Sequence, residues 1–375
     1  MWADLFCQVI DNYGDIGVTW RLARQLQHEH HVTLRLWVDD LETFARIEPL
    51  IHVNLDTQYV QGIEIRQWSP HSAVPTPYPV VITSFCCNLP AAWLRAMAVN
   101  PNQCWVELEY LSAESWVASH HLLHSKRADG LSPTFFYPGF TTNTAGLIRE
   151  QNLIQDRNLW QADIENQDIF LKQLGVSIKP RQQRPFLVSL FTYQDAPIQA
   201  LFNAFEHSQS LPDNQNSICV LVPEGVLMPE SLKIPSHVSW QRIPFLSQPD
   251  YDRLLWSMHL NIVRGEDSFV RAQWAGKPMI WHIYPQTENT HLVKLHAWLA
   301  QTDLPQAVKE AMVAWSTSTP NASAESAIRL ALNQPYWSIW QKAAQKHTNR
   351  LALLPDLASN LVKFCIQQTK NADSG

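Results

Sequence analysis

The sequence has few cysteines and lacks the cysteine spacing of a redox or zinc site. Six cysteines are spread over 375 residues, none of them forms a Cys-x-x-Cys pair, and Cys86 and Cys87 are adjacent. A disulfide framework is not expected from so few cysteines in so long a chain. The histidine clusters at 28–31 and 120–124 lack the spacing of a zinc protease and have no cysteine partners. We therefore expect reduced thiols, a cytoplasmic protein and no bound metal.

Other features are also absent, and each absence disfavours a class of protein. No apolar run approaches the length of a membrane span. The N-terminal segment contains Asp4 and no basic region, so we expect no signal peptide. The net charge of −6 argues against general binding of nucleic acid. Without a Gly-x-Gly-x-x-Gly turn a dinucleotide cofactor is disfavoured, and neither a Walker loop nor a Gly-x-Ser-x-Gly elbow is present.

What the sequence does contain is two series of alternating strand-like and helix-like segments. A chain of 375 residues is long enough for two domains. The second series begins at Phe186, after a polar, proline-flanked segment at 178–185 that we interpret as a linker. Alternating strands and helices predict parallel, doubly wound sheets. We therefore expect two α/β domains, at 1–182 and 183–355.

The stretch Asp11–Gly17 lies between the first predicted strand, Leu5–Ile10, and the first predicted helix, Val18–Leu26. In an open α/β sheet this is the carboxyl end of a strand, where ligands bind. The carboxylates of Asp11 and Asp15 would repel a phosphate. We expect instead a cationic partner or a reaction that needs a base. The alternative is that Asp15 only caps the helix.

The stretch Arg264–Ser268 again lies between a predicted strand and a helix that we expect to begin at Ser268. The backbone N–H groups of Asp267 and Ser268, together with the helix dipole, would bind a phosphate. Arg264 could add a bidentate cation. The alternative is an N-cap box with a surface salt bridge, although Glu266 has no obvious capping role.

Two aromatic residues also follow predicted strands of the second series. Tyr193 follows the first of these strands, and Phe245 follows the segment Val238–Ile243. We expect both to lie near the same sheet edge as Glu266, where a flat base could stack on them. Core packing is the alternative for each ring. Gln248 would either bond the edge of a base or cap its helix.

These features together favour a nucleotide-sugar glycosyltransferase that needs no metal. Two Rossmann-like halves would face each other across a cleft. The second half would hold the nucleotide diphosphate, and the first would hold the acceptor and the catalytic base.

Three stretches of the sequence resemble a known bacterial family. Residues 11–24 read DNYGDIGVTWRLAR, residues 36–40 read LWVDD, and residues 264–276 read RGEDSFVRAQWAG. The sequence is similar along its whole length to the protein-arginine rhamnosyltransferase that modifies translation elongation factor P. The resemblance implies a GT-B fold and an inverting transfer of rhamnose from dTDP-β-L-rhamnose to one arginine of the factor. The modified factor then relieves ribosome stalling at consecutive prolines.

The resemblance also implies roles for individual residues. It implies no cofactor besides the donor substrate, and a C-terminal helix, 356–375, that crosses back to the first domain. The essential acids correspond to Asp11, Asp15 and Glu266. The donor-binding residues correspond to Asn12, Gly17, Tyr193, Phe245, Gln248, Arg264, Asp267 and Ser268.

The chemistry of arginine fits such a set of acids. A guanidinium stays protonated, with a pKa above about 12, and is a poor nucleophile. One carboxylate could hold it through paired hydrogen bonds while a second takes a proton. The sequence leaves open whether Asp11 or Asp15 is the base.

Two other functions remain open at this stage. One is a glycosyltransferase with a small-molecule or glycan acceptor, which would not modify elongation factor P. The other is a non-catalytic nucleotide-binding or ribosome-associated module, which would tolerate the loss of both acids in the first stretch.

Overall fold

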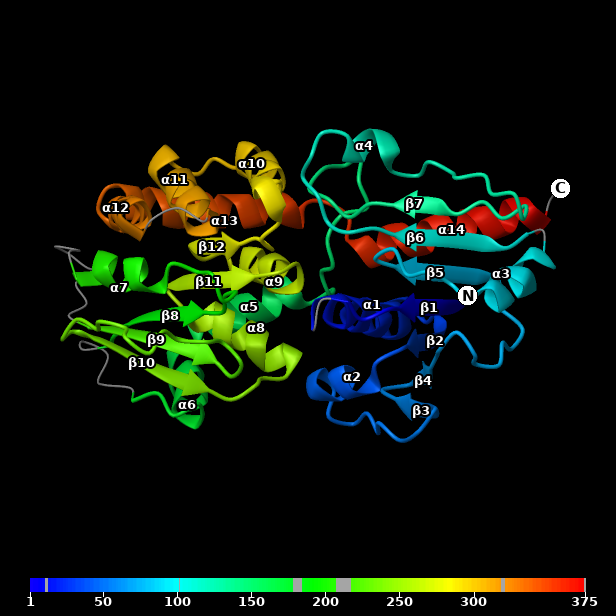
Figure 1. Ribbon diagram of the computed structural model, residues 1–375, viewed down its shortest axis with the longest axis horizontal. Coiled ribbons are helices and arrows are strands. Elements are labelled where there is room, and N and C mark those ends of the chain that lie inside the picture. The colour runs from blue at the N-terminus through cyan, green and yellow to red at the C-terminus, as the bar shows by residue number, and fades with distance from the viewer. Residues whose placement is uncertain (11–12, 101, 178–183, 207–216, 318–320, 374–375) are drawn as a thin grey trace. The chain divides into compact units, whose positions relative to one another are not determined.

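The structure, a computed structural model, describes the chain except residues 11–12, 101, 178–183, 207–216, 318–320 and 374–375. Asp11, Asn12 and most of the expected linker therefore lie outside the described residues. The chain forms two compact units (Figure 1). The first unit contains residues 1–151 and 354–375, and the second contains residues 152–353.

The first unit is built on a seven-stranded sheet in the order β3-β4-β2-β1-β5-β6-β7. Strand β3 pairs antiparallel with β4, and the other neighbours pair in parallel. Its strands are β1 (Trp2–Cys7), β2 (Thr33–Val38), β3 (Thr57–Val60), β4 (Ile63–Gln67), β5 (Val80–Ser84), β6 (Cys104–Leu108) and β7 (Thr134–Phe136). Its helices are α1 (Gly14–His30), α2 (Leu41–Ile47), α3 (Ala91–Ala98), α4 (Val117–His120) and α14 (Leu357–Asp373).

The central strand β1 is buried, as expected for an apolar strand in the middle of a parallel sheet. Its one charged residue, Asp4, is fully buried and is paired with Arg35 through contacts of 2.6 and 2.8 Å. Trp37 donates a further hydrogen bond to the same carboxylate at 2.8 Å. A buried charge needs such partners. With β1 in the middle, the carboxyl ends of β1, β5 and β6 lie side by side.

The structure corrects the expected start of the first helix. We predicted a strand at Leu5–Ile10 and a helix at Val18–Leu26, but the strand ends at Cys7 and α1 already begins at Gly14. Asp15 and Gly17 therefore lie in the first turn of α1 and not in a loop. The Gly17 N–H accordingly donates to the carbonyl of Tyr13 at 2.9 Å, as in a helix.

The C-terminal helix α14 belongs to the first unit, although the chain reaches it from the second. Figure 1 shows α14 in red alongside β6. The Leu357 N–H donates to the carbonyl of Leu147 at 2.9 Å, and the Asn360 side chain donates to the carbonyl of Ala145 at 3.0 Å. These bonds fix the start of α14 to the segment that follows β7.

The second unit is built on a five-stranded parallel sheet in the order β10-β9-β8-β11-β12. Its strands are β8 (Phe186–Leu190), β9 (Ile218–Pro223), β10 (Val238–Ile243), β11 (Leu260–Arg264) and β12 (Met279–His282). Its helices are α5 (Leu153–Ala162), α6 (Ile164–Gln173), α7 (Ile198–Glu206), α8 (Gln248–Ser257), α9 (Asp267–Ala275), α10 (His291–Ala300), α11 (Gln306–Ser316), α12 (Asn321–Leu332) and α13 (Tyr336–Ala352), with a short 3₁₀ helix, η3 (Thr287–Asn289).

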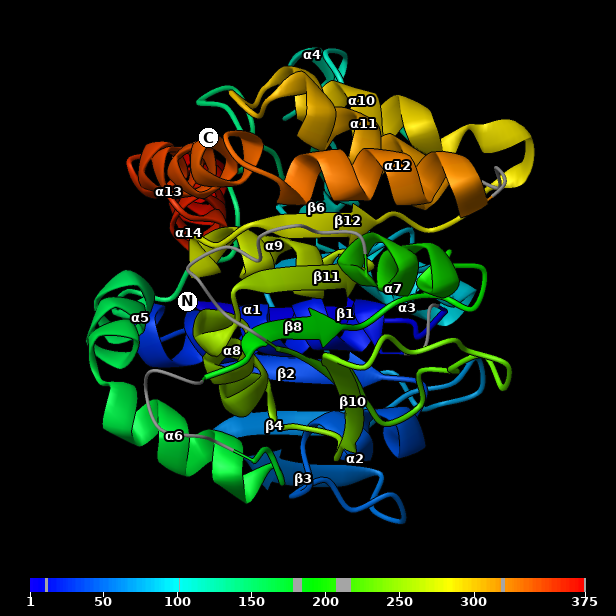
Figure 2. The same cartoon turned by 90° about the vertical axis from the view of Figure 1, so that its left-hand side faces the viewer.

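The boundary between the two units lies earlier in the chain than the sequence suggested. We expected a boundary between residues 182 and 183, but the contacts place it between Gln151 and Asn152. The reason is that α5 packs on the second unit, and Figure 2 shows it beside α8. Trp160 donates to the Ser257 hydroxyl at 2.9 Å, and Arg157 donates to the carbonyl of Trp274 at 2.8 Å.

Two further observations bear on the protein class. All six cysteines are free thiols. Within the described part of the chain, no helix combines the length and the apolar character needed to span a membrane.

Candidate functional site

The site in the second unit is built on the carboxyl ends of β8 and β11, which are neighbouring strands. Arg264 ends β11, and its guanidinium donates to the carbonyl of Thr192 at 3.0 Å. The guanidinium carbon lies 4.4 Å from the centre of the Phe191 ring and 4.9 Å from that of Tyr193. Two aromatic faces and a carbonyl therefore fix the orientation of this cation. The structure thus brings Tyr193 and Arg264 together, as the sequence predicted.

The start of α9 follows Arg264 directly. Gly265 has a φ of +65° and sits close to Tyr193, because a Cβ at this position would lie 3.5 Å from the Tyr193 hydroxyl. Glu266 is the residue before the helix, and its side chain makes no capping hydrogen bond. The helix begins at Asp267, one residue earlier than predicted, and Ser268 is buried. The N-cap box that we considered as the alternative is therefore not formed by Glu266.

Phe245 and Gln248 lie further along the same sheet edge. Phe245 follows β10, which is separated from β11 by β9 and β8, or about 14 Å at the usual strand spacing. Gln248 is the first residue of α8, and the preceding Ser247 caps that helix by accepting from the Asp250 N–H at 3.3 Å. Capping is thus the role of Ser247, not of Gln248. The α8 helix packs against α9, so both helices start from the same edge of the sheet.

Two residues at this edge were missed by the sequence analysis. His282 ends β12 and is 1% exposed, with Nδ1 2.6 Å from the Thr192 hydroxyl and 3.2 Å from the Tyr193 N–H. Burial lowers its pKa to about 4, so the imidazole is neutral at pH 7. Tyr251 on α8 packs edge-on against Phe191, and burial raises its pKa. The position of His282 at a strand end was a signal that could have identified it.

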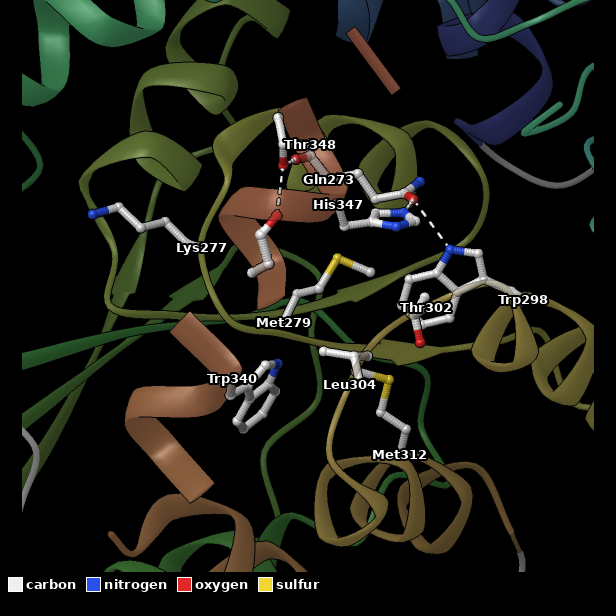
Figure 3. Close-up of a pocket in the computed structure, with 11 residues that line it drawn as sticks. Gln273, Lys277, Met279, Trp298, Thr302, Leu304, Met312, Trp340, His347 and Thr348 are labelled. Atoms are coloured by element: carbon white, nitrogen blue, oxygen red, sulfur yellow. Dashed lines mark hydrogen bonds between the residues drawn. The ribbon is translucent and has the colours of Figure 1, made fainter. Parts of the chain in front are cut away.

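The C-terminal half of α9 is anchored in the core of the second unit, as Figure 3 shows. The Gln273 side-chain oxygen accepts hydrogen bonds from Trp298 at 3.1 Å and His347 at 3.0 Å. The Thr348 hydroxyl donates to the Gln273 carbonyl at 2.5 Å. The adjoining cavity, lined by Met279 and other residues, has a volume of about 20 Å³ and is thus little larger than one water molecule. These contacts hold α9 firmly, so its N-terminus is presented by a rigid element.

The site in the first unit is centred on Asp15, which is 2% exposed. One carboxylate oxygen accepts from the Ile10 N–H at 2.9 Å, and the other accepts from the Tyr110 hydroxyl at 3.2 Å. The N-cap of α1 is Tyr13, which makes no side-chain capping bond. Asp15 is therefore not the cap of this helix. It is a buried carboxylate held at the junction of β1, α1 and β6.

More acids lie at the neighbouring strand ends of the first unit. Asp39 follows β2 and accepts from the Val9 N–H at 2.9 Å, and burial raises its pKa. Glu107 on β6 also has a raised pKa, first because of burial and then because of Glu109. Glu109 accepts from the Cys86 thiol at 3.7 Å. This edge of the sheet is thus acidic. Among the described residues, no three His, Cys, Asp or Glu are grouped as a metal site.

Comparison with known proteins identifies the family. The model of the Elongation-Factor P (EF-P) rhamnosyltransferase family matches residues 3–366. The chain belongs to this family. Its sequence is 41% identical to the protein-arginine rhamnosyltransferase of Pseudomonas aeruginosa over 381 residues, which cover 96% of this chain and 98% of the relative.

Two solved structures are similar to this chain over most of its length. One is a structure of EarP, solved to explain EarP-mediated arginine glycosylation of translation elongation factor EF-P. Its sequence is 33% identical to this chain, and the TM-score is 0.62. The match covers 97% of this chain and 98% of the EarP chain. UGT2 of Phytolacca americana, complexed with UDP-2-fluoro-glucose and pterostilbene, is only 9% identical but has a TM-score of 0.54, covering 98% and 99%. The predicted GT-B fold, with two Rossmann-like α/β units, is confirmed.

Proposed function

We propose that this chain transfers rhamnose from dTDP-β-L-rhamnose to one arginine side chain of translation elongation factor P, with inversion at the sugar. The observation that carries the proposal is the contrast between two strand edges. The edge of the first unit holds the buried carboxylate of Asp15. The edge of the second unit holds Arg264 beside the start of α9. A cationic acceptor suits the first edge, and an anionic donor suits the second.

The first unit receives the acceptor arginine. A guanidinium remains protonated at neutral pH and is a poor nucleophile until a proton is removed. One carboxylate of the pair Asp11 and Asp15 holds the guanidinium, and the other takes the proton as the nitrogen attacks the sugar. A single displacement inverts the anomeric centre, so the reaction needs no covalent intermediate with the enzyme.

The second unit receives most of the donor. The N–H groups at the start of α9, at Asp267 and Ser268, stabilise the leaving diphosphate together with Arg264. Because these groups supply the positive charge, the transfer runs without a metal. Tyr193 and Phe245 provide aromatic surface for the thymine. Gln248, Asn12 and Gly17 complete the donor contacts, and Glu266 acts as the third essential acid.

The direct test is the intact mass of elongation factor P after incubation with this chain and dTDP-β-L-rhamnose in the presence of excess chelator. We expect the mass to increase by one deoxyhexose unit, and the increase to disappear when the acceptor arginine is replaced by lysine. An unmodified factor, in a reaction in which the chain binds dTDP, would contradict the proposal. Loss of transfer on adding the chelator would contradict only the metal-independent mechanism.

A further inference from the structure

The hydroxyl of Tyr110 helps to hold the carboxylate of Asp15. It donates to Oδ1 at 3.2 Å, while the Ile10 N–H donates to Oδ2 at 2.9 Å. The two donors come from the segments that follow two different strands, β6 and β1. Both oxygens of the carboxylate are therefore held, and its rotation about the Cβ–Cγ bond is restricted.

Tyr110 is itself fixed by an aromatic stack. Its ring lies 4.8 Å from the ring of Phe85, with 23° between the planes. Phe85 is 1% exposed and follows β5 directly. Its N–H donates to the carbonyl of Leu108 at 2.7 Å. The stack thus connects the ends of β5 and β6 beneath the tyrosine.

The backbone of this turn adopts a conformation that side chains disfavour. Phe85 has a φ of +58° and Cys86 a φ of +57°, and neither residue is glycine. Left-handed conformations are unfavourable for residues that carry a Cβ. They are retained where the surrounding structure determines them, often at functional sites. Here the turn places a buried phenyl ring flat against Tyr110.

We propose that Tyr110 is a positioning residue for Asp15. A planar guanidinium bonds a carboxylate through two parallel hydrogen bonds, which requires the carboxylate plane to be set in advance. Tyr110 sets that plane through its hydroxyl, and Phe85 holds the tyrosine ring in place. The inference rests on the proposed function, because it assumes that Asp15 acts on the acceptor arginine. Tyr110 acts through Asp15 and does not itself react.

The test is Tyr110→Phe, which removes the hydroxyl and keeps the stacked ring. We expect kcat with elongation factor P to fall about 10- to 100-fold, the range for a lost hydrogen bond to a charged group. The affinity for dTDP-β-L-rhamnose and the melting temperature should change little. The matched control is Tyr59→Phe, which removes the same hydroxyl at a position that is 73% exposed on β3.

A double mutant separates positioning from a general structural effect. In the Asp15→Asn background, Tyr110→Phe should cause no further loss of kcat, because the two residues act as one unit. If Tyr110→Phe folds poorly, Phe85→Leu is the second variant, because it keeps the Tyr110 hydroxyl but removes the ring that stacks on Tyr110. We expect Phe85→Leu to lower kcat by less than Tyr110→Phe does, with normal donor affinity. Wild-type kcat in a folded Tyr110→Phe or Phe85→Leu variant overturns the inference and leaves the proposed function standing. A wild-type chain that binds donor but transfers nothing overturns both.

Discussion

The two units share a doubly wound, largely parallel architecture, yet the carboxyl edges of their sheets carry different groups. In the first unit, Asp15 lies in the first turn of α1, Asp39 follows β2 and Glu107 lies near the end of β6. In the second unit, Arg264 and the positive end of α9 occupy the equivalent edge. The fold supplies the position of each site, and we propose that the residues at the strand ends determine which ligand it accepts.

The largest expected effect comes from Asp15→Asn, which keeps the shape of the side chain and removes its charge. Transfer to elongation factor P should fall about 100-fold or more, in line with the loss of a general base. The affinity for dTDP-β-L-rhamnose should change little, because we propose that the nucleotide binds mainly to the second unit. Initial rates, donor calorimetry and melting temperature check this. Asp56→Asn, an exposed change in the same unit, is the control.

Arg264→Ala makes the complementary change in the second unit. The affinity for dTDP should weaken about 10- to 100-fold, because a charged hydrogen bond contributes about 1.5–3 kcal/mol. Turnover should fall as well, since we propose that the same cation stabilises the leaving diphosphate. Calorimetry with dTDP measures the first effect, and Arg329→Ala on α12 controls for the loss of one charge. Normal dTDP affinity would show that Arg264 only supports Phe191 and Tyr193.

Phe245→Ala tests how far the donor site extends along the edge. We expect a loss of about 1–3 kcal/mol in dTDP binding, the usual contribution of a ring that stacks on a base. The neighbouring Leu246 packs on the core, so Leu246→Ala should reduce stability without reducing dTDP affinity. An unchanged dTDP affinity in Phe245→Ala would mean that Phe245 serves core packing. The donor site would then be limited to the region of Tyr193.

The smallest effect concerns the pH dependence of the two units. Burial lowers the pKa of His259, His282 and His347 in the second unit from 6.5 to about 4. The unfolded chain binds more protons than the native one between these values, so the second unit loses stability as the pH falls from about 6.5 toward 4. In the first unit, burial lowers the pKa of one histidine, His121, to about 4 in the same way. There, however, Asp39 and Glu107 have raised pKa values, and their contribution favours the folded state as the pH falls.

Hydrogen exchange at pH 7 and pH 5, corrected for the intrinsic rates, can follow the units separately. We expect the protection of slowly exchanging amides to fall more in the second unit. An equal decrease in both units would mean that these buried groups do not distinguish them.

The sequence predicted several strand ends of the second unit well, because strand ends depend on local pattern, but it placed the end of β1 three residues too late. The strand Val238–Ile243 was predicted with the observed bounds, and α9 began within one residue of its predicted start. The start of α1 was wrong. Gly14 and Gly17 suggested a loop, but the helix includes both of them. Asp15 in its first turn accepts a hydrogen bond from Ile10, which follows β1.

Long-range contacts were beyond the reach of the local pattern. The polar segment at 178–185 suggested the boundary, whereas α5 packs on the second unit through side chains such as Trp160. The roles of Tyr110 and His282 depend on which strands are neighbours in the sheet. That order follows from tertiary packing, which the spacing of residues along the chain does not reveal.

The central claim is that the acidic edge of the first unit takes the acceptor and the cationic edge of the second takes the nucleotide. Hydrogen exchange with each ligand alone tests it most directly. We expect dTDP to protect residues 191–196 and 264–270, and elongation factor P to protect residues 84–87 and 108–112. Protection of 84–87 and 108–112 by dTDP, with no protection of 264–270, would contradict the account.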